Sequence, residues 1–186
     1  PTAGTSNVRF GVNAGNSIIS GGNYNVVVGD EAGTALTQGD ESVAVGFEAL
    51  MTASTGSENV GIGYRALKLT TGNSNVAVGK NALAANSSAS NNTAVGTSAL
   101  TANTTGSGST AVGKGALIAN TTGTDNTAVG SLSLDANTTG ANNAAFGAGA
   151  LSENTTASNN TAVGFYALVA NTTGTQNVAV GTESLK

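Results

Sequence analysis

Apolar and polar positions follow one short pattern along this chain, and the pattern recurs about every 17 residues. It is clearest at 126–142, NTAVGSLSLDANTTGAN, where we number the first Asn as position 1. A short fixed period indicates a stacked repeat whose units contact only their neighbours. The sequence therefore predicts a rod of about ten stacked coils. Copies begin at Asn7, Asn25, Ser42, Asn59, Asn75, Asn92, Ser109, Asn126, Asn143, Asn160 and Asn177.

Positions 2 to 5 predict a short strand that ends at a glycine. Position 2 is Val, Thr or Ala, and position 4 is a large apolar residue in every copy. β-Branched residues at alternate sites favour a strand over a helix. Position 5 is always Gly, which indicates a backbone bend with positive φ or a very close contact. The bends predicted in the regular copies are Gly46, Gly63, Gly79, Gly96, Gly113, Gly130, Gly147 and Gly164.

Position 3 lies on the opposite face of this strand. It is Ala or Gly in every copy from Ala44 onward, and only the first two copies differ, with Arg9 and Val27. A strand with uncharged residues on both sides is typical of a sheet that is buried on both faces. One face can close against its own coil, and the other must meet a further surface. Another copy of the chain is the simplest supplier of that surface.

Positions 8 to 11 predict a second strand, so that we expect two short strands per coil. Position 10 takes residues of every kind, which indicates a side that faces solvent. Position 9 points the other way and is a Leu in nine copies: Leu50, Leu67, Leu83, Leu100, Leu117, Leu134, Leu151, Leu168 and Leu185.

Asn-Thr-Thr-Gly at positions 12 to 15 predicts the return turn, because Asn and Gly accept left-handed conformations and Thr hydroxyls cap local backbone groups. Coils stacked about 4.8 Å apart bring equivalent residues into register. Amide side chains in register hydrogen-bond along the stack. We expect one ladder at position 1 and a second at position 12. The second ladder comprises Asn103, Asn120, Asn137, Asn154 and Asn171.

The N-terminal copies fit the pattern poorly. The first has an extra residue, and Gly15 and Gly33 replace the position-9 Leu. We predict an irregular cap or junction over residues 1–24 and a β-roll repeat domain over 25–186. The chain starts without Met and stops within a repeat, so we expect it to be a segment of a longer protein.

The strand segments 42–46 (SVAVG) and 59–63 (NVGIG) resemble the head repeats of YadA-like trimeric autotransporter adhesins. The resemblance covers about residues 7–186, and its motif recurs in phase. It implies a left-handed parallel β-roll with three chains around one axis. The unit is longer than the commonest one of that family, by residues in the Asn-Thr-Thr-Gly turn. In this respect it is similar to fibre segments of phage and environmental surface proteins.

The composition excludes several classes of function. Without His or Cys, a catalytic triad or a histidine metal site cannot form, so we expect neither an enzyme nor a cofactor. A net charge of −4 argues against nucleic-acid binding. The chain has no run of 18 apolar residues, so we expect no membrane insertion by this segment.

Two pairs of charged residues occupy equal positions in adjacent coils. Glu41 and Glu58 share position 17, so their carboxylates are expected within about 5 Å, where a Ca²⁺ ion would relieve their repulsion. Two solvated side chains at a turn is the interpretation that we favour. Glu48 and Arg65 share position 7 and are predicted to form a surface ion pair.

Asn-x-Ser/Thr triplets are acceptor sites for glycans in a secretory setting. A role in turns and ladders explains the same triplets without modification, and we favour it. Rows of Thr are also found in ice-binding solenoids, but Thr104 and Thr105 are adjacent and should point to different sides. The acceptor sites are Asn86, Asn91, Asn103, Asn120, Asn137, Asn154, Asn159 and Asn171.

These observations predict a structural extracellular fibre segment or adhesin head. We expect a stiff homotrimeric rod at a cell surface or on a virion that serves attachment, with a host-surface or matrix receptor or a glycan as its partner. One alternative is a ligand-binding repeat module for glycans or ice. A second alternative is the shaft of a phage tail fibre.

Overall fold

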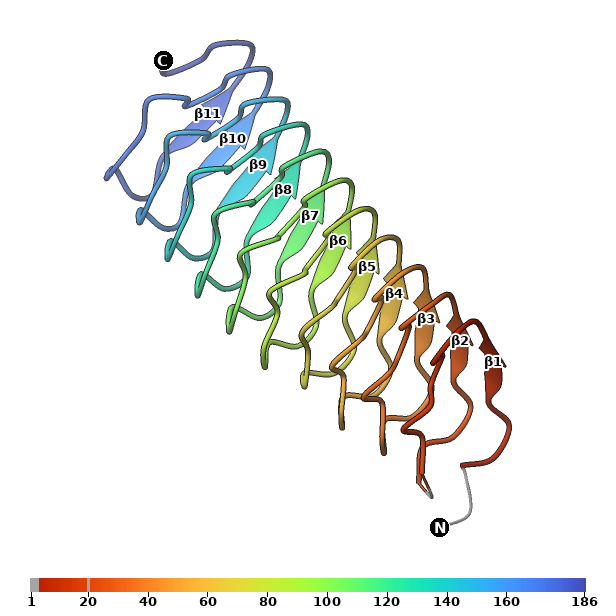
Figure 1. Ribbon diagram of the computed structural model, residues 1–186. Coiled ribbons are helices and arrows are strands. Elements are labelled where there is room, and N and C mark those ends of the chain that lie inside the picture. Colours follow the sequence, from red (N-terminus) through yellow and green to blue (C-terminus); the bar gives the residue numbers. More distant parts are fainter. Residues whose placement is uncertain (1–3, 20) are drawn as a thin grey trace.

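A computed structural model describes residues 4–19 and 21–186 as one elongated stack of coils (Figure 1). Each coil contributes one strand of three residues, and the eleven strands pair in parallel and in chain order as one sheet. This arrangement confirms the prediction of an all-β parallel solenoid of about ten turns. The strands are β1 (Val8–Phe10), β2 (Val26–Val28), β3 (Val43–Val45), β4 (Val60–Ile62), β5 (Val76–Val78), β6 (Thr93–Val95), β7 (Thr110–Val112), β8 (Thr127–Val129), β9 (Ala144–Phe146), β10 (Thr161–Val163) and β11 (Val178–Val180).

Strand pairing joins residues at the same repeat position. Thr110 pairs with Thr127, for example, and the interval between partners is 17 residues along most of the sheet. The interval falls to 16 between Val60 and Val76 and rises to 18 between β1 and β2. Both changes of length are therefore absorbed outside the strands. The first copy, which we assigned to a junction at 1–24, supplies β1 to the same sheet; residues 1–3 and 20 of that region lie outside the described residues.

The predicted second strand at positions 8 to 11 is wrong. Leu134 at position 9 has a φ of 50°, and Leu132 at position 7 has a φ of 55°. Residues in the left-handed region cannot belong to an extended strand. The segment still bonds to the next coil, as from the Leu134 N–H to the Ala150 carbonyl at 3.0 Å. Within the described ranges, each coil therefore has one strand followed by a chain of turns.

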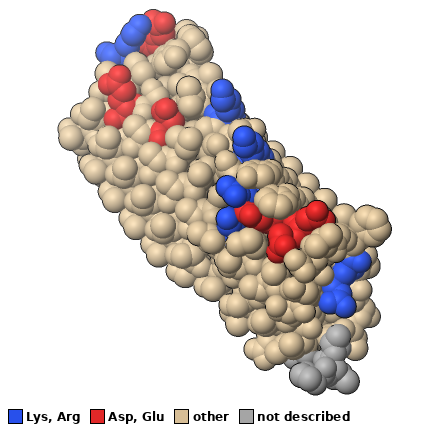
Figure 2. Space-filling view, viewed as in Figure 1, with Lys and Arg blue, Asp and Glu red and all other residues tan. Residues whose placement is uncertain are grey.

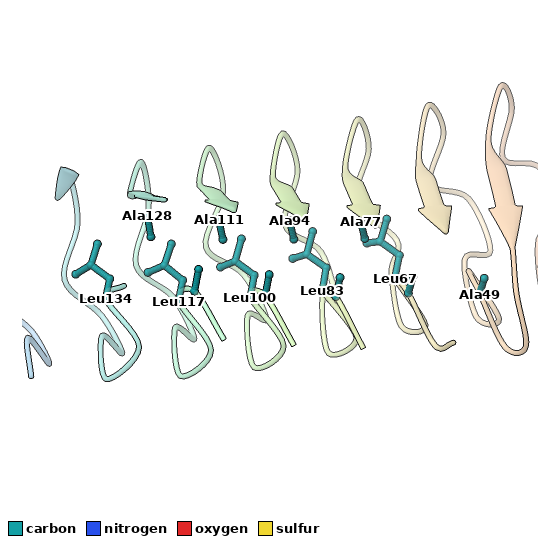
Figure 3. Close-up of a cluster of buried hydrophobic side chains, with 14 of the residues drawn as sticks. Ala49, Leu67, Ala77, Leu83, Ala94, Leu100, Ala111, Leu117, Ala128 and Leu134 are labelled. Carbon is teal, nitrogen blue, oxygen red and sulfur yellow. The ribbon is translucent and has the colours of Figure 1, made fainter. Parts of the chain in front are cut away.

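Position 3 faces the interior of the coil and closes it. Ala128 is fully buried, and Figure 3 shows the row of position-3 Ala side chains facing the row of Leu side chains from position 9. Positions 2 and 4 point outward, so that Val112, Phe146 and Val163 are 36%, 42% and 38% exposed. One face of the strand is therefore buried in its own coil as expected, and burial of the other face against another copy of the chain stays a prediction.

The position-5 glycines satisfy both reasons given for them. Gly46 has a φ of 126°, which an L-residue with a side chain rarely adopts. A Cβ at Gly46 would also lie 2.7 Å from the carbonyl oxygen of Gly63 in the next coil. Every coil therefore bends at this residue, and every coil before the last packs its bend directly on the backbone of the next one.

Candidate interaction surfaces

The position-1 side chains form one buried ladder along the rod. Asn143 Oδ1 accepts a hydrogen bond from the backbone N–H of Asn160 at 3.0 Å, and Asn126 Oδ1 accepts one from Asn143 at 3.0 Å. Ser109, which replaces Asn in its coil, accepts the N–H of Asn126 through its hydroxyl at 3.2 Å. Each coil thus binds the start of the next strand through a side chain.

The position-12 asparagines form the second predicted ladder. Asn120 Nδ2 donates to Asn103 Oδ1 at 2.9 Å, and Asn137 Nδ2 donates to Asn120 Oδ1 at 2.8 Å. The same Asn137 nitrogen also donates to the Gly140 carbonyl of its own coil at 3.0 Å. Each amide therefore ties its own turn together and links it to the preceding coil. Further bonds continue the ladder from Asn103 to Asn86, from Asn154 to Asn137 and from Asn171 to Asn154.

The conformation of the return turn differs from the one predicted. The left-handed residue is at position 17, as at Asp125 and Asn142 with φ of 56° and 58°, rather than at the Asn of position 12 or the Gly of position 15. Glycine at position 15 has a different cause, because a Cβ on Gly123 would collide with the carbonyl oxygen of Gly140.

Most of the candidate glycan acceptors are unsuited to carry a glycan in the folded chain. A glycan would be attached to Nδ2, and that atom is buried and hydrogen-bonded in Asn86, Asn103, Asn120, Asn137 and Asn154. Asn171 is half-buried, and its Nδ2 donates to Asn154 Oδ1 and to the Gly174 carbonyl. Asn91 and Asn159 lie at position 17 and are exposed. The ladder explains the buried triplets.

Glu41 and Glu58 are both exposed, and the Glu58 carboxylate accepts a hydrogen bond from the Ser74 hydroxyl at 2.9 Å. In the described part of the chain, no group of three or more His, Cys, Asp or Glu side chains is placed to hold a metal ion. The two Thr residues at the turn do point differently. Thr104 donates its hydroxyl to the Thr121 carbonyl at 3.0 Å, whereas Thr105 is exposed.

The outward-pointing residues at positions 2 and 4 of β1–β11 make one continuous surface, which we call the outer face. Val or Ile fills both positions in β2–β5. From β6 onward Thr replaces Val at position 2 in four strands, while position 4 stays apolar. The outer face thus runs the length of the rod as an apolar stripe, with a hydroxyl row added in its C-terminal half.

A cluster of aromatic and charged side chains lies at the turn that follows the strands β3 to β5. Arg65 Nε donates to Glu48 Oε2 at 2.7 Å, which confirms the predicted ion pair, and Lys68 Nζ donates to the same oxygen at 2.8 Å. The Phe47 and Tyr64 rings stack with centroids 5.7 Å apart, and the Arg65 guanidinium lies 4.9 Å from the Tyr64 centroid. The hydrogen bonds from Lys68 and then Arg65 lower the pKa of Glu48.

Four of the six cationic residues gather on the same edge of the rod, at positions 6, 7 and 10 of the coils that start at Asn59, Asn75 and Ser109. Figure 2 shows blue side chains along one edge of the rod, with red side chains beside them and others near the C-terminal end. Sequence reasoning missed this line, because the net charge of the whole chain is negative. We call it the basic edge: Arg65, Lys68, Lys80 and Lys114.

The carboxyl group of Asp135 is partly buried without a cationic partner in the part of the chain that the structure describes. Asp135 Oδ1 is buried and has no hydrogen-bond partner within the described ranges. Burial raises the pKa of Asp135, and the neighbouring backbone N–H groups offset part of that increase. Asp135 occupies position 10, which the sequence assigned to solvent.

No pocket is found in residues 4–19 and 21–186, so that the candidate surfaces are the outer face and the basic edge. A helix long and apolar enough to cross a membrane is also absent from these residues. Comparison with protein-family models, with curated proteins and with solved structures finds no match for this chain.

Proposed function

We propose that this chain is a structural segment of an extracellular fibre, a stiff homotrimeric rod that supports attachment at a cell surface or on a virion. The outer face carries the proposal. Its position-4 residues are apolar along the whole sheet, although the coils already close through the inward Ala and Leu rows. A continuous apolar surface of this extent marks an interaction site in a soluble protein.

Another copy of the chain is the occupant that fits this surface best. Parallel copies in register place the Val-rich half of one outer face against the Val-rich half of the next, and the Thr-bearing halves likewise. In a closed symmetric assembly, every copy then buries the same outer face. The number three and the left-handed coil are what the resemblance to trimeric autotransporter heads implies.

The mechanical role follows from how the coils are joined. Strand pairing and the position-1 ladder connect each coil to the next, and the position-12 ladder adds a further row from Asn86 onward, so that bending the rod breaks hydrogen bonds in several rows at once. The shaft of a phage tail fibre requires the same properties and remains the alternative context for the segment.

Two substitutions on β8 test the assembly. Val129→Glu places a charge on the outer face and should separate the copies while each coil stays folded. Ala128→Glu buries a charge inside the coil, which should cost several kcal/mol and disrupt the fold. Light scattering at micromolar concentration should give three times the chain mass of 17.8 kDa for the unmodified chain and a lower mass for Val129→Glu.

Circular dichroism separates the two effects, since Val129→Glu should keep the spectrum that Ala128→Glu loses. A folded, monomeric unmodified chain would overturn the proposed assembly. Assembly of Val129→Glu at the full mass would move the interface away from the outer face.

A further inference from the structure

The basic edge departs from what the repeat needs at its exposed corner. Position 6 accepts Thr97, Ser131 and Ala148 in other coils, so a large or charged side chain there is not required for stacking. In the neighbouring coils the same position holds Tyr64 and Lys80, and both are exposed. A repeat that tolerates small residues at a surface position, yet concentrates aromatic and cationic ones in a few coils, has a local feature that folding does not explain.

Three cations of this edge, Arg65, Lys68 and Lys80, contact other side chains. Glu48 fixes Arg65 through Nε, which leaves the two terminal nitrogens of the guanidinium for another acceptor. Lys80 Nζ lies 6.0 Å from the Tyr64 ring centroid, on a ring that also contacts Arg65. Cations that are already oriented lose less conformational entropy when they bind an anion.

We propose that the basic edge binds an acidic polysaccharide that lies along the rod. The line from Arg65 to Lys114 spans three coil steps, or about 14 Å. Within the coils that begin at Asn59, Asn75, Asn92 and Ser109, positions 6, 7 and 10 carry no acidic residue. A row of positive charges that starts with the adjacent Arg65 and Lys68 and continues to Lys80 and Lys114 in later coils fits a linear polymer with spaced negative charges.

Charge density distinguishes this ligand from a nucleic acid. Duplex DNA carries one negative charge per about 1.7 Å, or about eight charges over the same length. The edge supplies four cations, and Glu48 neutralises part of that charge. The rest of the chain is negative enough to give a net charge of −4 and would repel a dense polyanion. A polysaccharide with one carboxylate or sulfate every sugar or two matches the spacing better.

Binding of the purified chain to hyaluronate and to polygalacturonate tests the proposal, with dextran as the neutral control and a short DNA duplex as the competing class. Lys114→Gln should weaken binding to the acidic polysaccharides and lower the salt slope by about one. Lys80→Gln with Lys114→Gln should weaken it by roughly tenfold. Lys186→Gln is the matched control, because it removes the same charge from an exposed lysine outside the edge.

Unchanged binding by Lys186→Gln together with the loss in Lys114→Gln would support the proposal. Equal losses in both variants, tighter binding to DNA, or the absence of binding to either acidic polysaccharide at low salt would overturn it. The proposal does not depend on the fibre role. Light scattering of the same variants reports assembly separately, so that failure of one proposal leaves the other standing.

Discussion

The second coil and the seventh coil fill the same cross-section in different ways. In the coil that begins at Asn25, position 3 is Val27, position 9 is Gly33 and position 12 is the fully buried Leu36. The coil that begins at Ser109 has Ala, Leu and Asn at these positions. A Cβ on Gly33 would lie 3.2 Å from Val27 Cγ1, so the larger residue at position 3 occupies space that the Leu side chain takes elsewhere.

The first coil follows the same rule, which explains why glycine replaces Leu at position 9 in both N-terminal copies. Gly15 is at position 9, Ile18 at position 12 is buried, and Arg9 at position 3 donates to the Gly15 carbonyl at 2.9 Å. The volume of side chains inside a coil is therefore nearly constant, whereas the repeat positions that provide the large side chains differ between coils. The exchange has one consequence for hydrogen bonding, since an apolar residue at position 12 cannot join the Asn ladder.

The largest effect that tests this comparison is the loss of the interior Leu. Leu117→Ala should destabilise the chain by about 2–5 kcal/mol, because a cavity is left between rigid neighbouring coils. Leu36→Ala should have an effect of the same size, although Leu36 is at position 12. Urea denaturation of both variants measures this. If Leu36→Ala were harmless, the two residues would not be filling equivalent space.

Removal of one ladder amide should have the next largest effect. Asn137→Ala loses the bonds to Asn120 and Gly140 and leaves the Nδ2 of Asn154 with one partner fewer. Buried groups without partners cost about 1–3 kcal/mol each, so we expect a loss of about 2–3 kcal/mol. Thr139→Ala, at an exposed position of the same turn, is the control and should change stability by less than about 0.5 kcal/mol.

The sequence predicted the features that depend on side-chain pattern and missed those that depend on backbone conformation. The strand at positions 2 to 4, the bend at Gly130 and the Asn ladder follow from residue type and spacing. The second strand failed because alternating Leu and polar residues resemble a strand, whereas Leu132 and Leu134 are both left-handed. Hydrophobic periodicity does not report the sign of φ. The basic edge was missed because a total charge does not report where the charges lie.

Introduction of a Leu at position 9 of the second coil, as in the later coils, should change stability by less than the two preceding substitutions. Gly33→Leu adds a side chain where Val27 and Leu36 already fill the interior, and overpacking costs about 1–3 kcal/mol. Adding Val27→Ala and Leu36→Asn to Gly33→Leu rebuilds the regular coil and should recover most of the loss. Thermal melts of the single and triple variants test this. A triple variant no more stable than the single one would show that the exchange of volume is not the reason for Gly33.

The smallest expected effect concerns two carboxyl groups in different halves of the rod. Glu48 has two cationic partners, and its pKa is lowered chiefly by the hydrogen bond from Lys68. Asp135 has no cation nearby that forms an ion pair among the described residues, and burial raises its pKa. The two groups should therefore shift stability with pH in opposite directions.

For Asp135, the folded chain holds the proton more tightly than the unfolded chain does. Its stabilising contribution is complete below the unfolded pKa and is lost as the pH rises through the folded pKa. For Glu48 the contribution is present above the unfolded pKa and is lost as the pH falls through the folded one.

Asp135→Asn should therefore stabilise the chain at pH 7, by less than about 1 kcal/mol, and the gain should vanish near pH 3. Glu48→Gln should destabilise at pH 7 and become neutral in acid. Melting temperatures at both pH values distinguish the two signs, and a gain from Asp135→Asn that persisted at pH 3 would mean that shape rather than charge makes this carboxyl unfavourable.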